Sequence, residues 1–267
     1  MAATINNIQL NGQPVYYRIE GKGKPVVLVH GFAEDGTVWE NQVEYLKNKY
    51  QLIVPDLPGS GQSPINDANW SMEYFAECIR AILDAEKIGA VSMIGHSMGG
   101  YITLAFAETW PERLRSFGLF HSTAFADSEE KKTARRRGIE FIEQNGPAKF
   151  LAQSIPNLFS EETKKQQPEL VGKILARFSN FIGQSLVNYY QCMMVRPDRT
   201  HVLKNFPRPV LFILGKYDTA VPYVQGLQQC YLPGLSYFHT LEHSGHMGMW
   251  EEPVPGNSFV DAFLMHE

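Results

Sequence analysis

The sequence predicts an α/β protein in which a mostly parallel central sheet is flanked by helices. Short apolar runs rich in β-branched residues recur along the chain, and segments with helical spacing of apolar residues separate them. Strands that alternate with helices in this way form parallel sheets through right-handed crossovers. A third observation concerns the start of the chain, where Asn11-Gly12 lies between two strand-like runs and predicts a hairpin with a type I′ turn within the first twenty residues.

Six later runs have the composition of buried strands and extend one sheet. They are PVVLVHGF (25–32), QLIVPDLPGSG (51–61), AVSMIG (90–95), RSFGLFHS (115–122), RPVLFILG (208–215) and LSYFHTLE (235–242). Between the first two runs, Val38, Val43 and Leu46 follow helical spacing, and a second helix is expected after Ser71, which has the residue type of an N-cap.

The stretch from 121 to 205 shows helical patterns without intervening strands, and we interpret it as a helical cap inserted into the core. The predicted organisation is therefore a first core segment at 1–120, a helical cap at 121–205 and a second core segment at 206–267. The cap carries 13 Lys and Arg against 9 Asp and Glu, which leaves a net charge of +4 there and −8 elsewhere. This asymmetry indicates an acidic ligand.

A basic cluster supplies much of the cap's charge, but acidic neighbours at Glu129 and Glu130 favour a solvated helix face for it. The cluster consists of Lys131, Lys132, Arg135, Arg136 and Arg137.

Composition excludes several classes of protein. The 44% hydrophobic and 19% charged residues are ordinary for a globular chain, and the net charge of −4 argues against nucleic acid as a partner. No apolar stretch approaches the roughly 18 residues of a membrane span, and no basic-then-apolar leader begins the sequence. Cys78, Cys192 and Cys230 have no metal-ligand spacing and fit reduced thiols. We expect a cytoplasmic protein without metal, cofactor or membrane partner.

The segment GHSMGG (95–100) carries the strongest signal for chemistry. It matches G-x-S-x-G, follows a predicted strand and precedes a helix-like segment. A serine at such a sharp turn is held in a strained conformation, and side chains at positions 95 and 99 would collide with the turn, which glycine avoids. The turn would expose the Ser97 hydroxyl and place the Met98 N–H at the positive end of a helix.

A serine hydroxyl becomes a nucleophile when a base takes its proton, and the base needs an acid to orient it. Asp218 lies in the loop after the strand-like run 208–215, and His246 lies between two glycines after the last run. The chain order Ser97, Asp218, His246 is the one expected for this architecture.

Taken together, these motifs resemble the α/β-hydrolase superfamily, in its cap-bearing serine hydrolase branch. The motifs that carry the resemblance are HGF (30–32), DLPGSGQS (56–63), GHSMGG (95–100), GKYDTAVP (215–222) and SGHM (244–247). The resemblance implies the α/β-hydrolase fold, with Ser97 as nucleophile, His246 as general base and acid, and Asp218 as the acid that orients His246. It also implies an oxyanion hole made by the backbone N–H groups of Phe32 and Met98.

Each of these assignments has a competitor in the sequence. His243 could be taken for the base, and Asp127 or Asp198 for the acid, although loop position favours His246 and Asp218. His30 and His96 are expected to support loops by hydrogen bonds, and Asp56 to fix the turn of the DLPGSG segment. Seven large cap residues could line an acyl pocket or belong to the core: Phe159, Phe178, Phe181, Tyr189, Tyr190, Met193 and Met194.

Motifs that the sequence lacks reduce the number of reaction types that we expect. Relatives that open epoxides or remove halogens carry aspartate at the nucleophile, whereas position 97 is serine, and Phe32-Ala33 replaces the glycines of the HGGG loop of many lipases. The predicted activity is hydrolysis of a carboxylic ester, thioester or lactone of a small molecule through an acyl-enzyme on Ser97. Carbon-carbon bond hydrolysis and perhydrolysis on the same triad are alternatives. A small-molecule receptor with little turnover is the alternative from another class.

Overall fold

A computed structural model describes residues 4–266 of the chain. Residues 1–3, which belong to the predicted hairpin and first core segment, and residue 267 lie outside the described residues.

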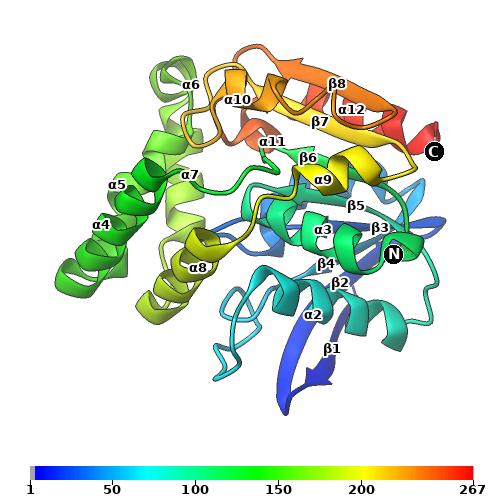
Figure 1. Ribbon diagram of the computed structural model, residues 1–267. Coiled ribbons are helices and arrows are strands. Elements are labelled where there is room, and N and C mark those ends of the chain that lie inside the picture. Colours follow the sequence, from blue (N-terminus) through cyan, green and yellow to red (C-terminus); the bar gives the residue numbers. More distant parts are fainter. Residues whose placement is uncertain (1–3, 267) are drawn as a thin grey trace.

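One eight-stranded sheet forms the centre of the molecule, with the strand order β1-β2-β4-β3-β5-β6-β7-β8 (Figure 1). Neighbouring strands from β4 to β8 run parallel, whereas β1 with β2 and β2 with β4 pair antiparallel. The predicted mostly parallel sheet is therefore confirmed. Its strands are β1 Thr4–Leu10, β2 Gln13–Gly21, β3 Lys24–Val29, β4 Tyr50–Pro55, β5 Val91–His96, β6 Leu114–Phe120, β7 Val210–Gly215 and β8 Ser236–Leu241.

The N-terminal hairpin forms where the sequence predicts it. Leu10 pairs with Gln13 across a two-residue turn, and both turn residues have positive φ, 52° at Asn11 and 77° at Gly12. Positive φ at both positions defines the type I′ turn, which asparagine and glycine tolerate best.

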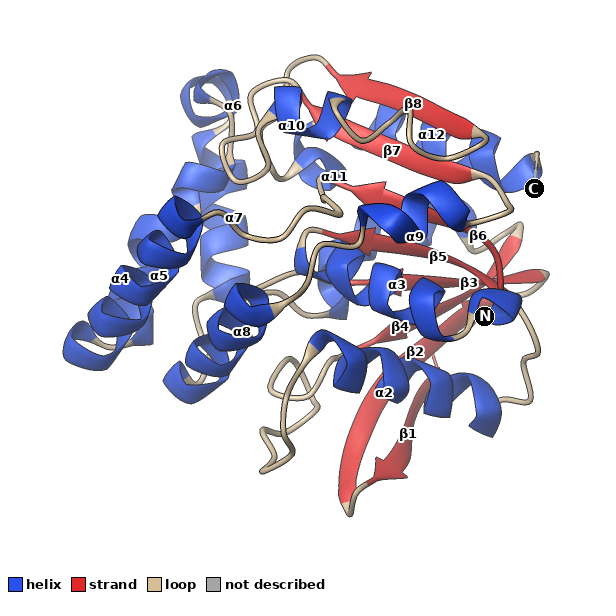
Figure 2. Cartoon of the chain, in the orientation of Figure 1, coloured by secondary structure: helices blue, strands red, loops and turns tan. Residues whose placement is uncertain are grey.

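Helices cover both faces of the sheet, as Figure 2 shows. Strand β3 shows why two apolar layers are needed, because Val27 and Val29 pack into the core under α2 and α3, whereas Val26 and Leu28 face α1 and α12. Ser71 caps α2 as expected, since its side chain accepts the Tyr74 N–H. The helices outside the 121–205 stretch are α1 Glu40–Leu46, α2 Met72–Ala85, α3 Met98–Thr109, α10 Tyr223–Leu227, α11 Gly248–Glu251 and α12 Pro253–Met265, with 3-10 turns η1 Gly36–Trp39 and η2 Pro111–Arg113.

Between β6 and β7 the chain is helical, and α4, α5, α7 and α8 gather beyond one end of the sheet (Figure 1). The glycine at 138 lets α4 and α8 pack closely, since a Cβ there would lie 2.8 Å from the Tyr190 ring. The elements of this helical segment are α4 Glu129–Asn145, α5 Pro147–Ser154, η3 Pro156–Leu158, α6 Glu161–Gln166, α7 Pro168–Phe178, α8 Gly183–Val195 and α9 Thr200–Asn205.

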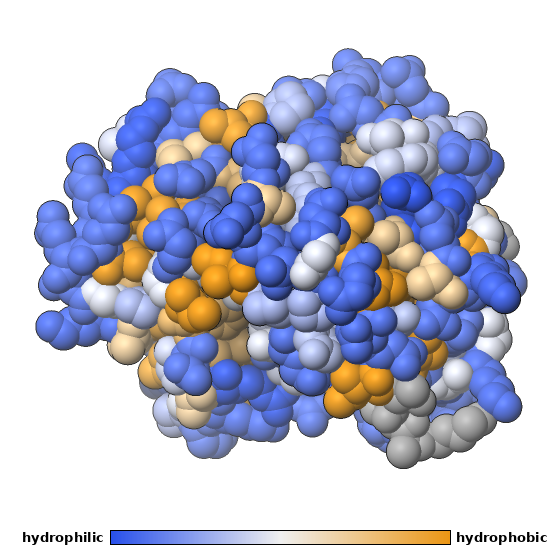
Figure 3. All heavy atoms as spheres, turned by 90° about the horizontal axis from the view of Figure 1, so that it is seen from below, coloured by the Kyte–Doolittle hydropathy of each residue, from blue (hydrophilic) through white to orange (hydrophobic). Residues whose placement is uncertain are grey.

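The face shown in Figure 3 is mostly hydrophilic, with hydrophobic residues in separate patches. Within residues 4–266, no helix has the length and apolar character needed to cross a membrane.

Candidate active site

Ser97 occupies a strained turn between β5 and α3. Its backbone has φ 51° and ψ −116°, a conformation that costs free energy for a residue with a side chain. The Ser97 N–H donates to the Phe120 carbonyl at 3.0 Å, and the Ser97 carbonyl accepts the Ser122 hydroxyl at 2.7 Å. The Ser97 side chain makes no capping hydrogen bond to α3 and is partly exposed, while its neighbours on both sides are buried. The turn therefore leaves the hydroxyl available.

Glycines around Ser97 allow backbone to meet backbone. A Cβ at Gly95 would lie 2.3 Å from the Gly99 carbonyl oxygen, and a Cβ at Gly99 would lie 2.2 Å from the Val29 carbonyl oxygen. Neither contact could be relieved by a side-chain rotation, because both partners are backbone atoms. The steric reason for the G-x-S-x-G spacing is confirmed.

The loop after β3 lies directly beside Ser97. A Cβ at Gly31 would lie 3.2 Å from the Ser97 Cβ, so the backbone that leads into Phe32 passes next to the serine. The Phe32 ring stacks on Tyr190 of α8, with ring centroids 4.3 Å apart. Met98 is the first residue of α3, where N–H groups have no partner within the helix.

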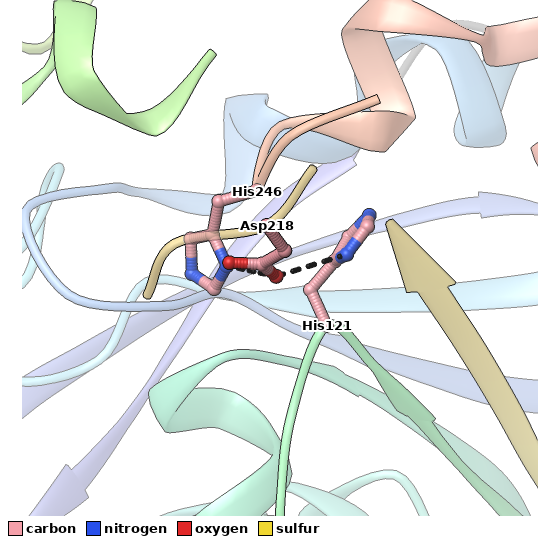
Figure 4. A group of neighbouring side chains, drawn as sticks. All are labelled: His121, Asp218 and His246. Carbon is pink, nitrogen blue, oxygen red and sulfur yellow. Dashed lines mark hydrogen bonds and ion pairs between the residues drawn. The ribbon is translucent and has the colours of Figure 1, made fainter. Parts of the chain in front are cut away.

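Asp218 and His246 are hydrogen-bonded and buried (Figure 4). His246 Nδ1 lies 2.7 Å from Asp218 Oδ2. The other carboxylate oxygen, Oδ1, accepts the N–H groups of Ala220 and Val221, both at 2.8 Å. The loop after β7 therefore fixes the carboxylate, and the carboxylate fixes the orientation of the imidazole ring.

Burial opposes ionisation of Asp218, but the charge of His246 and the hydrogen bond from His246, together with the nearby His121, outweigh it and hold the pKa of Asp218 well below its ordinary value. The carboxylate is therefore ionised at neutral pH and can only accept. Consequently His246 Nδ1 carries the proton of this hydrogen bond, and Nε2 is the ring nitrogen left to act as a base.

His121 is a second histidine on the same carboxylate, and sequence reasoning missed it. Its Nδ1 lies 3.2 Å from Asp218 Oδ2 and 3.0 Å from the donating Gly215 N–H (Figure 4). Burial lowers the pKa of His121 to about 4, so the ring is neutral near pH 7. One ligand atom from each of His121, Asp218 and His246 lies within 4.8 Å of the other two, so these three residues could also hold a metal ion.

A buried ion pair joins three loops around Ser97. Glu34 Oε2 accepts the Gly31 N–H at 2.7 Å and lies 2.9 Å from His96 Nδ1. His96 Nε2 lies 3.0 Å from the His246 carbonyl oxygen. A carboxylate and a carbonyl only accept, so both ring nitrogens donate and His96 is an imidazolium. Burial disfavours both charges, but their mutual attraction lowers the pKa of Glu34 and raises the pKa of His96.

A cavity of about 330 Å³ opens onto Ser97 and His246. Its walls come from the sheet edge and from the helices α4 and α8. The other lining residues are Phe32, Glu34, Tyr101, Lys131, Ala134, Arg135, Leu158, Tyr190, Met193, Thr219, Ala220 and Val221. A smaller apolar cavity of about 80 Å³ shares Phe32, Glu34, Leu158 and Tyr190 with it.

The structure places most competing residues away from this cavity. His243 is exposed and lies 3.0 Å from Glu162 through Nδ1, and Asp198 is exposed and bonds Thr200. Asp127 is buried and pairs with Arg135 and Arg196.

The expected supporting roles of three other polar residues are confirmed. His30 accepts the Leu57 N–H, His96 joins loops as described, and Asp56 accepts the N–H groups of Gly36 and Gln62.

Some of the cap residues singled out in the sequence line the two cavities. Of the seven large residues considered for an acyl pocket, Tyr190 and Met193 line the Ser97 cavity and Phe178 lines the smaller one. The interpretation of the basic cluster as a solvated face is wrong for Lys131 and Arg135, which line the Ser97 cavity.

Glu34 and His121 had a signal that could have found them. His121 directly follows the carboxyl end of β6, as Ser97 follows β5, and Glu34 lies in the loop after β3, as Asp218 lies in the loop after β7. Functional side chains of α/β sheets gather at that edge.

The fold and this arrangement define a hydrolase of the alpha/beta class. The family model for the alpha/beta hydrolase fold matches residues 24–253, and the chain belongs to this family.

Several proteins are similar to this chain over nearly its whole length. A 2-hydroxy-6-oxononadienedioate/2-hydroxy-6-oxononatrienedioate hydrolase of Burkholderia vietnamiensis is 28% identical over 94% of this chain and 90% of its own length. The solved structure of a thermophilic esterase from Thermogutta terrifontis, with malate bound, is 29% identical, with a TM-score of 0.91 over 100% of this chain and 99% of that chain. The enol-lactonase of Burkholderia xenovorans shares the fold, at 21% identity and a TM-score of 0.89 over 97% of this chain and 100% of its own.

Gly99→Ala is expected to lower the free energy of unfolding by about 3 kcal/mol, because the added Cβ meets two backbone carbonyl oxygens. Gly172→Ala in α7 is the matched control, since a Cβ there meets nothing within 4 Å and alanine favours the helix by about 1 kcal/mol. Urea denaturation of both variants measures the difference. Equal stability of the two would contradict the steric account of the turn.

Glu34→Gln is expected to destabilise the protein by about 3 kcal/mol, because it leaves His96 buried without its counterion. The contribution of Glu34, whose pKa is lowered, is present above its ordinary 4.5 and is lost as pH falls through the folded value. The contribution of His96, whose pKa is raised, is present below its ordinary 6.5 and is lost as pH rises through the folded value. The stability difference between native and variant protein should therefore peak between pH 4.5 and 6.5.

Urea denaturation across pH 3.5–9 gives this profile, with Glu44→Gln as the control for an exposed ion pair with Lys47. A difference that does not vary with pH would show that Glu34 and His96 are not a charged pair.

Proposed function

We propose that the chain is a serine hydrolase that cleaves a carboxylic ester, thioester or lactone of a small molecule through an acyl-enzyme on Ser97. The observation that carries the proposal is the pairing of a strained, available serine with a buried Asp218–His246 hydrogen bond on one cavity. Belonging to the alpha/beta hydrolase family supports a hydrolytic reaction.

In the first step, His246 Nε2 takes the proton of the Ser97 hydroxyl as Oγ attacks the carbonyl carbon of the substrate. Asp218 keeps Nδ1 protonated and stabilises the imidazolium that forms, without taking the proton itself. The tetrahedral intermediate then collapses, the carbon–oxygen bond to the alcohol breaks, and His246 returns its proton to the leaving oxygen. The acyl group stays on Ser97 as an ester.

The negative charge of the tetrahedral intermediate needs donors that are already in place. We assign this role to the backbone N–H groups of Phe32 and Met98, which flank Ser97 from the loop after β3 and from the start of α3. Donors of this kind contribute about 3–4 kcal/mol each to the transition state. The Glu34–His96 pair supports this arrangement, since it holds Gly31, the turn at Ser97 and the His246 loop together.

In the second step, a water molecule loses a proton to His246 and attacks the acyl carbon. The acid is released when the bond to Ser97 Oγ breaks and His246 returns the proton to the serine.

These two chemical steps need no cofactor or metal. The proposed partner is the small-molecule substrate, without nucleic acid or membrane. We further propose a cytoplasmic location, because Cys78, Cys192 and Cys230 are free thiols.

Carbon-carbon bond hydrolysis is the second candidate. The relatives that cover the chain include hydrolases of 2-hydroxy-6-oxo dienedioates, and the same three residues could act on a ketone carbonyl. Parallel assays with an ester and with a 2-hydroxy-6-oxo dienoate, followed by loss of its conjugated absorbance, distinguish the two reactions.

Ser97→Ala is expected to abolish hydrolysis of p-nitrophenyl esters of increasing acyl length, because no other hydroxyl occupies the turn. Steady-state release of p-nitrophenol measures it, and Ser179→Ala, in the helical segment, is the control that should keep the native rate. Persistent turnover by Ser97→Ala would contradict the proposal. A single turnover by the native protein would favour the alternative function of a small-molecule receptor.

Asp218→Asn is expected to lower kcat by about ten-thousand-fold, because an amide would hold His246 in the wrong tautomer. Asp198→Asn removes an exposed carboxylate and is the matched control. The kcat values of the two variants on one ester decide the assignment, and a near-native rate for Asp218→Asn would contradict it.

A further inference from the structure

We propose that the substrate of the Ser97 site carries a carboxylate, which Lys131 and Arg135 bind at the α4 wall of the cavity. The inference rests on the proposed function, because it names the class of ester that the same site hydrolyses.

Two cations of the basic cluster on helix α4, Lys131 and Arg135, face the cavity. Lys131, Ala134 and Arg135 are spaced three and four residues apart, so they share one face, and all three line the cavity that contains Ser97. Lys132 belongs to the same cluster but pairs with Glu129 and is not among the lining residues. The helix therefore separates cations that face the substrate from cations that face solvent.

This wall has more positive than negative charge. Asp127 Oδ2 lies 2.6 Å from Arg135 Nε, and Asp127 Oδ1 lies 2.8 Å from Arg196 Nη1, so one carboxylate serves two guanidinium groups. Lys131 Nζ donates to the Ala220 carbonyl at 2.8 Å, and among residues 4–266 no carboxylate lies within ion-pair distance of it. Three cations against one anion leave two positive charges in excess.

Burial makes this excess costly without a counterion. The side chains of Arg135 and Arg196 are 13% and 3% exposed, and that of Asp127 is fully buried. Buried charge is stable when an opposite charge and hydrogen bonds match it, and the free space beside these cations is the substrate cavity. A substrate carboxylate would supply the missing negative charge, with two further Lys131 N–H donors available to it.

Tyr101 reports the positive potential inside the cavity. It lies one helical turn after Ser97 on α3, and the Arg196 guanidinium stacks 3.7 Å from its ring centroid. Burial would raise the pKa of Tyr101, yet the charges of Arg196, Lys131 and Arg135 outweigh burial and lower it. The same field attracts an anion bound in the cavity.

Glu34 does not cancel this field, although it also lines the cavity. Its carboxylate is matched by the His96 imidazolium at 2.9 Å, so the pair adds no net charge. Asp218, behind Ala220 and Val221, adds one negative charge, so one of the two excess positive charges of the wall is left and the sign of the cavity stays positive.

The test compares esters that differ only in a carboxylate. On the acyl side, mono-p-nitrophenyl adipate is compared with p-nitrophenyl hexanoate, and on the alcohol side 4-acetoxybenzoate is compared with 4-acetoxybenzamide. The native protein should give a higher kcat/KM for the charged member of at least one pair. Lys131→Gln should reduce that charged-to-neutral ratio by about tenfold to a hundredfold, the range of a charge-assisted hydrogen bond.

Lys132→Gln is the matched control, since it removes the same charge from the next residue of the same helix. The ratio should stay at its native value in this variant. A native ratio of one or less for both ester pairs, or an equal loss in the Lys131 and Lys132 variants, would overturn the inference.

Binding of adipate keeps the test independent of turnover. Calorimetry on the native protein should show adipate binding more tightly than adipamide, with the adipate Kd about tenfold weaker in Lys131→Gln and unchanged in Lys132→Gln. If no ester is hydrolysed, the proposed function fails and this measurement alone decides the inference. Adipate binding no better than adipamide would then overturn it.

Discussion

Close contact between backbone segments at Ser97 is the constraint on which the rest of the site depends. Glycines at 95 and 99 bring the end of β5, the start of α3 and the end of β3 into backbone contact, and Gly31 leaves room for the side chains of Glu34, His96 and Ser97. The positive φ of Ser97 follows from this crowding, and the surrounding backbone hydrogen bonds hold the strained conformation in place. Because the crowded side of the turn is filled, the serine side chain is left on the open side.

Buried charges then connect this turn to the residues that would act with it. His96, next to Ser97 in the chain, holds the His246 carbonyl, and its partner Glu34 holds the loop that leads to Phe32. Asp218 holds the His246 ring from the loop after β7. The helical segment joins the same arrangement, since the His246 N–H donates to the Leu158 carbonyl. Each component of the proposed mechanism is therefore positioned by at least one interaction that spans two loops.

Local signals in the sequence were enough to predict the sheet, the hairpin and the Ser97 turn. Apolar runs, Asn11-Gly12 and the spaced glycines each specify their own structure through short-range sterics. Asp218 and His246 were predicted from their places after strands, and the structure brings them together. Their roles remain proposals.

Glu34 and His121 were missed although both lie near strand ends, because their partners His96 and Asp218 are distant in sequence and a single chain gives no sign of which buried polar groups meet. The orientation of α4 could not be predicted either. Whether Lys131 or Lys132 faces the cavity depends on how that helix packs against α8.

In the proposed mechanism, the acyl group of the substrate becomes covalently attached to Ser97. The most direct test is mass spectrometry of the protein quenched with acid during hydrolysis of a p-nitrophenyl ester, followed by peptide mapping. The spectra should show one acyl group per chain, located on Ser97 and absent from Ser97→Ala. Steady turnover of the native protein with the acyl group on another residue would contradict it.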